Sequence, residues 1–217
     1  LSSRREYTKI NPFVVLLGKG DHPITSSWTY SSGYETQTTI GITRSNITFL
    51  GEGKDTTTIL GGFRIENLEN IRFKNMTVTN TSEYGHGIIM TNAKVELMDA
   101  VLKGCSDTGL YITNSTSEAI VVATRCEFAN SRVGAAVGGR LTSATFNNCL
   151  FHDNSNDGIQ VRQCTIHLHG EATAIHSNER IGIIALRSGK VLIHLPSHHN
   201  TSYNNGHEDR TILLGGT

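Results

Sequence analysis

Residues 144–161 read ATFNNCLFHDNSNDGIQV, a stretch with three short apolar segments separated by turn-forming residues. The segments are Ala144-Thr145-Phe146, Cys149-Leu150-Phe151 and Gly158-Ile159-Gln160-Val161. Apolar and variable residues alternate in the first and third segments, as in strands that are buried on one face. Asn, Asp and Ser fill the connections, where they favour turns. The stretch therefore predicts three short β-strands.

The same pattern recurs along the chain at a nearly constant period. Segments that resemble Ala144-Thr145-Phe146 begin at residues 47, 71, 95, 120, 144, 166 and 191, at spacings of 22–25 residues. A Gly followed by an apolar strand recurs at residues 87, 109, 134, 158 and 182, at the same spacing. Two independent markers with one period indicate a repeat protein.

Three short strands per repeat predict an all-β solenoid, a parallel β-helix of about seven or more coils in which stacked coils share one core. Alternation along the first strand predicts these inward side chains: Ile71, Phe73, Val95, Leu97, Ile120, Val122, Phe146, Ile166, Leu168, Val191 and Ile193. On the third strand it predicts Ile88, Met90, Leu110, Ile112, Val137, Ile159, Val161, Ile183, Ile212 and Leu214.

The composition agrees with short strands joined by many turns. The 217 residues include 26 Thr, 18 Ser, 17 Asn and 22 Gly, and 19 Lys+Arg balance 19 Asp+Glu. This composition argues against a helical bundle, a coiled coil and a basic nucleic-acid binder. No apolar run approaches the length of roughly 18 residues that a membrane helix needs. We therefore expect neither a nucleic-acid nor a membrane partner.

The cysteines and sequons say little about chemistry. Cys105, Cys126, Cys149 and Cys164 fit no zinc-binding spacing and are expected to be buried free thiols. The sequence predicts no bound metal or cofactor. Slight support for an extracellular, cell-surface or virion-associated protein comes from the sequons at Asn46, Asn75, Asn80, Asn114 and Asn200.

The repeat divides the chain into two parts. Residues 1–45 fit the period poorly and are expected to form an N-terminal cap with irregular first coils, because open strand edges must be covered. Residues 46–217 are expected to form one continuous β-helix. Its last coil has an apolar strand and no capping segment, so a further chain or a partner is expected to cover it.

The pattern resembles the right-handed parallel β-helix of the pectin-lyase-like superfamily over residues 10–217. FLGEGKDTTTI (49–59) is similar to an early coil of such proteins, with a Gly-x-Gly turn before a Thr-x-Ile strand. FHDNSNDGI (151–159) resembles the turns of the generic right-handed β-helix repeat. The resemblance implies the fold but no single function. The superfamily includes polysaccharide lyases, polygalacturonases, pectin methylesterases, uronan epimerases, phage tailspikes and interaction modules without known catalysis.

Most catalytic motifs of these families are missing. Asn156-Asp157-Gly158 is a partial match to one polygalacturonase motif, and Gly85-His86-Gly87 matches another but lies three coils too early. The Asp pair of polygalacturonases, the Arg-Pro-Trp of pectin methylesterases and the Asp-Pro-His-Asp of mannuronan epimerases do not occur. No stacked acidic cluster suggests the calcium site of pectate lyases.

Outward columns of residues, one coil apart, are where a site is expected. One column is predicted to contain Lys103, Ala129, His152, His176 and either His198 or His199. A second outward group has His167, His169 and His194. Stacked imidazoles near carboxylates could bind a metal, act as acid and base, or sense pH. A solvated polar face explains the same residues.

The catalytic candidates are Asp153, Asp157, His152, His176 and Arg162, because two nearby carboxylates could divide acid and base roles in glycoside cleavage. Both carboxylates also fit structural roles, Asp157 in the turn before Gly158 and Asp153 at a strand end. The binding candidates are Tyr111, Gln160, Lys103, His199 and Arg180. An unusually apolar outer column is expected to pack under a loop or a partner; it contains Ile89, Tyr111, Ala136, Gln160, Ile184 and Leu213.

Two classes of function follow. The first is a non-catalytic β-helix scaffold or binding module, which takes a protein or glycan along one flank or assembles end to end. The alternative is a polysaccharide-active enzyme, a lyase, glycoside hydrolase or uronan epimerase, that acts on an extended glycan in a surface groove. The missing motifs favour the first class, so whether the protein is an enzyme stays open at this point.

Overall fold

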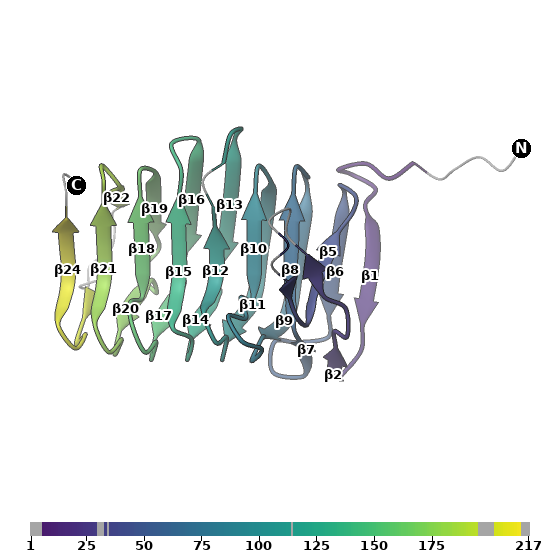
Figure 1. The fold of residues 1–217 in the computed structure, drawn as a ribbon, viewed down its shortest axis with the longest axis horizontal. Coiled ribbons are helices and arrows are strands. Elements are labelled where there is room, and N and C mark those ends of the chain that lie inside the picture. Colours follow the sequence, from purple (N-terminus) through teal and green to yellow (C-terminus); the bar gives the residue numbers. More distant parts are fainter. Residues whose placement is uncertain (1–5, 30–32, 34, 114, 195–201, 214–217) are drawn as a thin grey trace, which may run out of the picture.

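The computed structural model describes residues 6–29, 33, 35–113, 115–194 and 202–213. The secondary structure assigned to these residues consists of strands, turns and bends, and no helix among them is long and apolar enough to cross a membrane. The coils stack side by side into an elongated solenoid (Figure 1). The predicted all-β parallel solenoid is confirmed.

Three rows of parallel strands run along the solenoid. The first row contains β1 (Phe13–Leu17), β6 (Ile47–Gly51), β9 (Ile71–Thr79), β11 (Lys94–Lys103), β13 (Ala119–Thr124), β16 (Thr142–Asn147), β19 (Thr165–His169) and β22 (Lys190–Ile193). The second row contains β2 (Gly20–Pro23), β7 (Thr57–Leu60), β9 and β11 again, β14 (Glu127–Ala129), β17 (Leu150–His152), β20 (Ala174–His176) and β23 (Ser202–Tyr203). The third row contains β5 (Thr39–Ile42), β8 (Gly62–Glu66), β10 (Ile88–Thr91), β12 (Thr108–Ile112), β15 (Val133–Gly138), β18 (Ile159–Arg162), β21 (Ile181–Leu186) and β24 (Glu208–Leu213).

Two coils have two strands where three were predicted, because β9 and β11 each pass through the first and second rows without a break. A bend separates the two halves of each strand, at Asn75 (φ 55°) and Asp99 (φ 50°). Arg125 and Asn148 adopt the same left-handed conformation in the following coils, where the strand is interrupted. The corner is thus the same in four successive coils.

The interior is a continuous apolar column, and one part of its prediction was wrong. Val121 and Ala123 are fully buried, whereas Ile120 and Val122 are only partly buried. Val121 pairs with Val95 in the neighbouring coil, which sets this register. The run from residue 120 to residue 123 is apolar throughout, so alternation alone could not decide which face points inward.

Stacked aromatic rings form the centre of this column. The rings of Phe128 and Phe151 lie 4.6 Å apart at an interplanar angle of 6°, and Phe146 meets Phe151 edge-on at 5.0 Å. All three are fully buried. Like side chains therefore stack on like from coil to coil. The four cysteines are buried free thiols, as predicted, and burial raises the pKa of Cys105 and of Cys164 to about 11.

A ladder of asparagines runs beside the third row, with Asn154 and Asn178 buried and Asn205 partly buried. Asn154 donates through Nδ2 to Asn178 Oδ1 (2.8 Å), and Asn178 donates in the same way to Asn205 Oδ1 (2.8 Å). The recurrent Gly packs against this ladder, since a Cβ on Gly158 would lie 2.9 Å from Asn178 Nδ2 and 2.7 Å from the Gly182 carbonyl oxygen. Asn154, Asn178 and Asn205 lie in connections between strands, where asparagine favours turns.

The two ends differ. At the first end, β1, β2 and β5 pair in parallel with later strands. Strands β3 (Trp28–Thr29) and β4 (Glu35–Thr36) form an antiparallel pair. The Arg64 guanidinium carbon lies 5.7 Å from the centroid of the Trp28 ring. At the other end, Ile212 is 60% exposed, and Leu214 lies outside the described residues. The expected cap at residues 1–45 and the expected cover over the last coil stay predictions.

Candidate functional site

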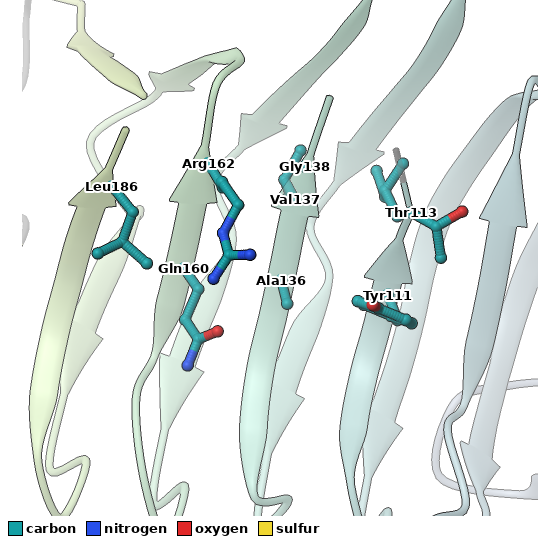
Figure 2. A pocket seen from close by; sticks show the side chains of 9 residues that line it. Tyr111, Thr113, Ala136, Val137, Gly138, Gln160, Arg162 and Leu186 are labelled. Carbon is teal, nitrogen blue, oxygen red and sulfur yellow. The ribbon is translucent and has the colours of Figure 1, made fainter. Parts of the chain in front are cut away.

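A recess opens on the outer face of the third row. It has a volume of about 170 Å³ and extends over four successive coils. Figure 2 shows Tyr111 on one side, Gln160 and Arg162 on the other, and Leu186 at the far edge. The lining residues are Tyr111, Ile112, Thr113, Ala136, Val137, Gly138, Gln160, Arg162 and Leu186.

The recess exists because one coil has almost no outward side chains. Ala136 pairs with Tyr111 of the preceding coil and with Gln160 of the following coil, so these three residues form one outward column. Gly138 pairs with Arg162 in the next outward column. Larger side chains therefore project on both sides of a floor made from a methyl group and a bare backbone. We call this feature the third-row pocket.

The aromatic wall of the pocket is supported from behind. The rings of Tyr111 and His86 stack with centroids 4.9 Å apart and an interplanar angle of 19°. His86 Nδ1 accepts a hydrogen bond from the Thr108 backbone N–H (3.3 Å). Burial lowers the pKa of His86, and nearby Asp107 opposes this effect in part. A neutral imidazole therefore holds the Tyr111 ring in place at pH 7.

The amide wall is held by one of the predicted catalytic carboxylates. Asp157 is only 3% exposed. Its Oδ2 accepts from Gln160 Nε2 (2.8 Å), and its Oδ1 accepts from the Ile181 backbone N–H (3.2 Å). Both carboxylate oxygens are thus engaged, and Asp157 positions Gln160 at the pocket.

Arg162 supplies the charge of the pocket. Its side chain is exposed and lies along the pocket in Figure 2. Among the described residues, no carboxylate lies within ion-pair distance of its guanidinium. None of the lining residues is acidic. The pocket therefore offers five N–H donors and a positive charge to a ligand.

The predicted histidine column lies on a different face, outside the second row. Lys103, Ala129, His152 and His176 are in register, as expected. The next member is Tyr203, so the expectation that His198 or His199 continues this column was wrong. Residues 195–201 lie outside the described part of the chain, His199 included. The length of that connection shifts the register, which the period could not reveal.

The column contains a short stack of rings. His176 lies 5.2 Å from the His152 ring and 5.1 Å from the Tyr203 ring, measured between centroids. Partial burial lowers the pKa of His176, and His152 adds to the effect. His152 Nδ1 lies 2.6 Å from Asp153 Oδ2, and its Nε2 lies 3.5 Å from Glu127 Oε1. Asp153 has a φ of 54°, which suits its expected place at a strand end.

The structure thus divides the candidate residues into two groups. Tyr111, Gln160 and Arg162 line the third-row pocket, with Asp157 bonded to Gln160. The second-row group contains Lys103, His152, Asp153 and His176. Arg180 lies outside both groups and donates to Asn156 Oδ1 (2.8 Å). The two carboxylates have their partners in separate groups, and the catalytic role expected for them stays a prediction.

Sequence reasoning missed Gly138 and His86 as contributors to the pocket, and it placed Ala136 in the apolar outer column without predicting a recess. Ala136 and Gly138 act through the side chains that they lack, and His86 precedes its strand in a loop. The Gly85-His86-Gly87 motif was a usable signal for His86. The register of the apolar outer column is confirmed from Ile89 to Ile184, and its packing under a loop or a partner stays a prediction. Its last member was wrong, because Ile184 pairs with Thr211 and not with Leu213.

A family model described as a right handed beta helix region matches residues 61–212. The chain belongs to the right-handed β-helix family. The match covers the stacked coils that carry the pocket and the histidine column, and it establishes the predicted handedness. No curated protein matches this β-helix chain.

Solved structures similar to this β-helix protein include two pectin methylesterases. Pectin methylesterase PemA from Erwinia chrysanthemi superposes with a TM-score of 0.55 at 16% identity, over 84% of this chain and 64% of that one. A pectin methylesterase mutant in complex with hexasaccharide IV gives a TM-score of 0.53 at 14% identity, with the same coverage of 84% and 64%. ORF18 of Geobacillus virus E2 gives 0.40 at 12% identity, over 92% and 52%. At these identities the likeness concerns the fold alone.

Proposed function

We propose that this β-helix protein is a non-catalytic binding module that holds an acidic sugar residue of a polysaccharide in the third-row pocket. The observation that carries the proposal is the composition of the pocket, in which one aromatic ring and one guanidinium lie on opposite sides of a floor of Ala136 and Gly138. The pectin methylesterases of similar fold act on a polysaccharide, as their names say, and this agrees with a glycan ligand.

Each wall suits one part of a uronic acid residue. The Tyr111 ring presents an apolar face to the C–H groups of a pyranose. The Arg162 guanidinium matches a carboxylate in planar, bidentate geometry. Gln160, with its amide nitrogen bonded to Asp157, keeps its carbonyl oxygen available to accept from a sugar hydroxyl.

The same contacts argue against catalysis in the pocket. Glycoside cleavage by a pair of carboxylates needs an acid and a base beside the scissile bond. No lining residue is acidic, and the nearest predicted candidate, Asp157, is buried with both oxygens engaged. The pocket is therefore built to hold a ligand rather than to transfer its protons.

Binding of oligogalacturonates tests the proposal. We expect calorimetry to detect binding of galacturonate oligomers and none of neutral galactose oligomers of equal length. Arg162→Gln removes a charge-assisted pair worth about 1.5–3 kcal/mol, so affinity should fall at least about tenfold. Arg180→Gln is the matched control, because Arg180 is an exposed arginine outside the pocket.

Three outcomes would contradict this function. Equal binding of acidic and neutral oligomers would remove the role of Arg162, and so would unchanged affinity in the Arg162→Gln variant. Release of new reducing ends, unsaturated sugars or methanol from pectic polymers by the wild-type protein would show an enzyme.

A further inference from the structure

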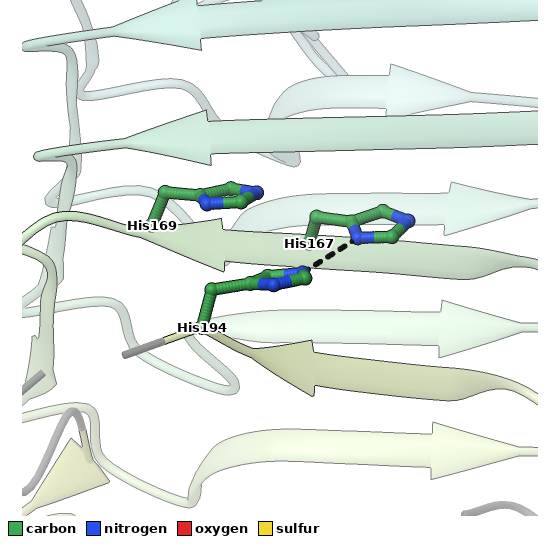
Figure 3. Close-up of side chains that lie close together, drawn as sticks. All are labelled: His167, His169 and His194. Atoms are coloured by element: carbon green, nitrogen blue, oxygen red, sulfur yellow. Dashed lines mark hydrogen bonds between the residues drawn. The ribbon is translucent and has the colours of Figure 1, made fainter. Parts of the chain in front are cut away.

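A second set of polar side chains lies on another face, outside the first row and away from the third-row pocket. His167 and His169 point outward from β19, two residues apart and therefore on the same side of the strand. His194 directly follows β22, the strand that pairs with β19. Figure 3 shows the three imidazoles gathered over this strand pair. They form what we call the first-row histidine cluster.

The cluster is compact. The rings of His169 and His194 stack with centroids 4.0 Å apart, and His167 Nδ1 lies 2.8 Å from His194 Nε2. One nitrogen from each of the three side chains can be chosen so that all lie within 4.8 Å of one another. All three residues are half-buried.

We infer that His167, His169 and His194 form a binding site for one divalent transition-metal ion of the Zn²⁺ type. Neutral imidazole is a preferred ligand of Zn²⁺, Cu²⁺ and Ni²⁺. Nitrogens bound to tetrahedral zinc at ~2.0–2.1 Å lie about 3.4 Å apart, so the cluster needs only side-chain rotations to close on an ion. Three protein ligands leave one position for water.

The ring orientation defines the movement that binding requires. The three rings are nearly parallel, with interplanar angles of 6°, 13° and 19°, so their in-plane lone pairs do not yet converge. Rotation about the side-chain bonds of half-buried residues turns the nitrogens toward a common centre without moving the strands. The backbone register already supplies the spacing, because Leu168 lies opposite Ile193 and His169 and His194 are the residues that follow them.

The close approach of the three rings suits metal binding, because their centroids lie 4.0, 5.1 and 6.1 Å apart. Each protonated ring would repel its neighbours, and a metal ion replaces those protons while it holds the rings together. The four cysteines offer no competing site, because all of them are buried.

Titration of the tag-free protein with Zn²⁺ tests the site. We expect one Zn²⁺ per chain by calorimetry, and an absorption spectrum with Co²⁺ that reports nitrogen ligation. His194→Gln should weaken Zn²⁺ binding at least about tenfold, since even loss of an outer-shell partner costs 10–100-fold. Excess Zn²⁺ should also raise the melting temperature of the wild-type protein and not that of the variant.

The matched control is the double variant His152→Gln and His176→Gln, which removes a stacked histidine pair from the second row. It should keep wild-type Zn²⁺ affinity. The proposal is overturned if the wild-type protein binds no Zn²⁺, or if the control loses binding as strongly as His194→Gln. Circular dichroism of each variant checks folding, and His167→Gln and His169→Gln repeat the test if His194→Gln is unfolded.

Discussion

The interior of the coils and the outer face of the third row are built from the same strands, yet they change in opposite ways along the solenoid. Inside, identical residues stack in successive coils: Asn154 donates a hydrogen bond to Asn178, and the ring of Phe128 stacks on that of Phe151. Outside, the in-register residues of successive coils are all different, namely Tyr111, Ala136, Gln160 and Ile184. Repetition stabilises the stack because each side chain supports its copy in the next coil. The break in repetition creates the pocket.

This contrast assigns separate consequences to the two regions. A change in a repeated inner residue should lower stability, whereas a change in a non-repeated outer residue should alter binding and leave stability nearly constant. Four experiments test this division.

Phe151→Ala should have the largest effect. Phe151 is fully buried and contacts the rings of Phe128 and Phe146 at 4.6 and 5.0 Å. Truncation of a buried Phe costs about 3–5 kcal/mol, through lost burial and the cavity left behind. Urea unfolding followed by circular dichroism measures the change. The control is Leu141→Ala, because the Leu141 side chain is 52% exposed. This substitution should change the free energy of unfolding by less than about 0.5 kcal/mol.

Asn178→Ala should cost less, about 1–3 kcal/mol, because it leaves buried partners without hydrogen bonds. Asn178 Nδ2 donates to the Phe151 carbonyl oxygen (3.2 Å) and to Asn205 Oδ1 (2.8 Å), and its Oδ1 accepts from Asn154 (2.8 Å). The same unfolding measurement detects the loss. Asn156→Ala is the control, because Asn156 is half-exposed and lies outside the ladder. Equal effects at the two positions would mean that the ladder contributes no special stability.

Ala136→Leu tests the outer face. The added side chain fills the floor of the third-row pocket, so the binding of galacturonate oligomers should weaken at least about tenfold, or 1.4 kcal/mol. The core is untouched, so the urea midpoint should stay close to that of the wild type. Ala174→Leu, an equivalent change on an outer position of the second row, should leave binding unchanged. A large loss of stability in Ala136→Leu would contradict the division between inside and outside.

The same contrast explains which features the sequence could predict. Repeated residues such as the Gly158 column and the Asn178 ladder return once per coil, so a period reveals them. The prediction of inward side chains was wrong at residues 120–123, because four apolar residues in a row hide the alternation. The prediction of the second-row column was wrong at its last member, which is Tyr203, because the connection before this strand differs in length from those of earlier coils. The pocket depends on missing side chains, as at Ala136, and no residue pattern reports an empty volume.

The smallest expected effect concerns pH and His86, which supports the pocket from the loop before β10. Burial lowers the pKa of His86 in the folded state, with Arg132 and Arg64 acting in the same direction and Asp107 against it. The unfolded chain then binds more protons than the folded one as the pH falls through the ordinary histidine pKa of about 6.5. Stability contributed by neutral His86 is therefore present at pH 7.5 and declines toward pH 5. Thermal melts at the two pH values should show a larger decrease for the wild type than for His86→Gln. Identical decreases would mean that His86 is as easily protonated in the folded protein as in the unfolded chain, and that the Tyr111 wall does not depend on a neutral imidazole.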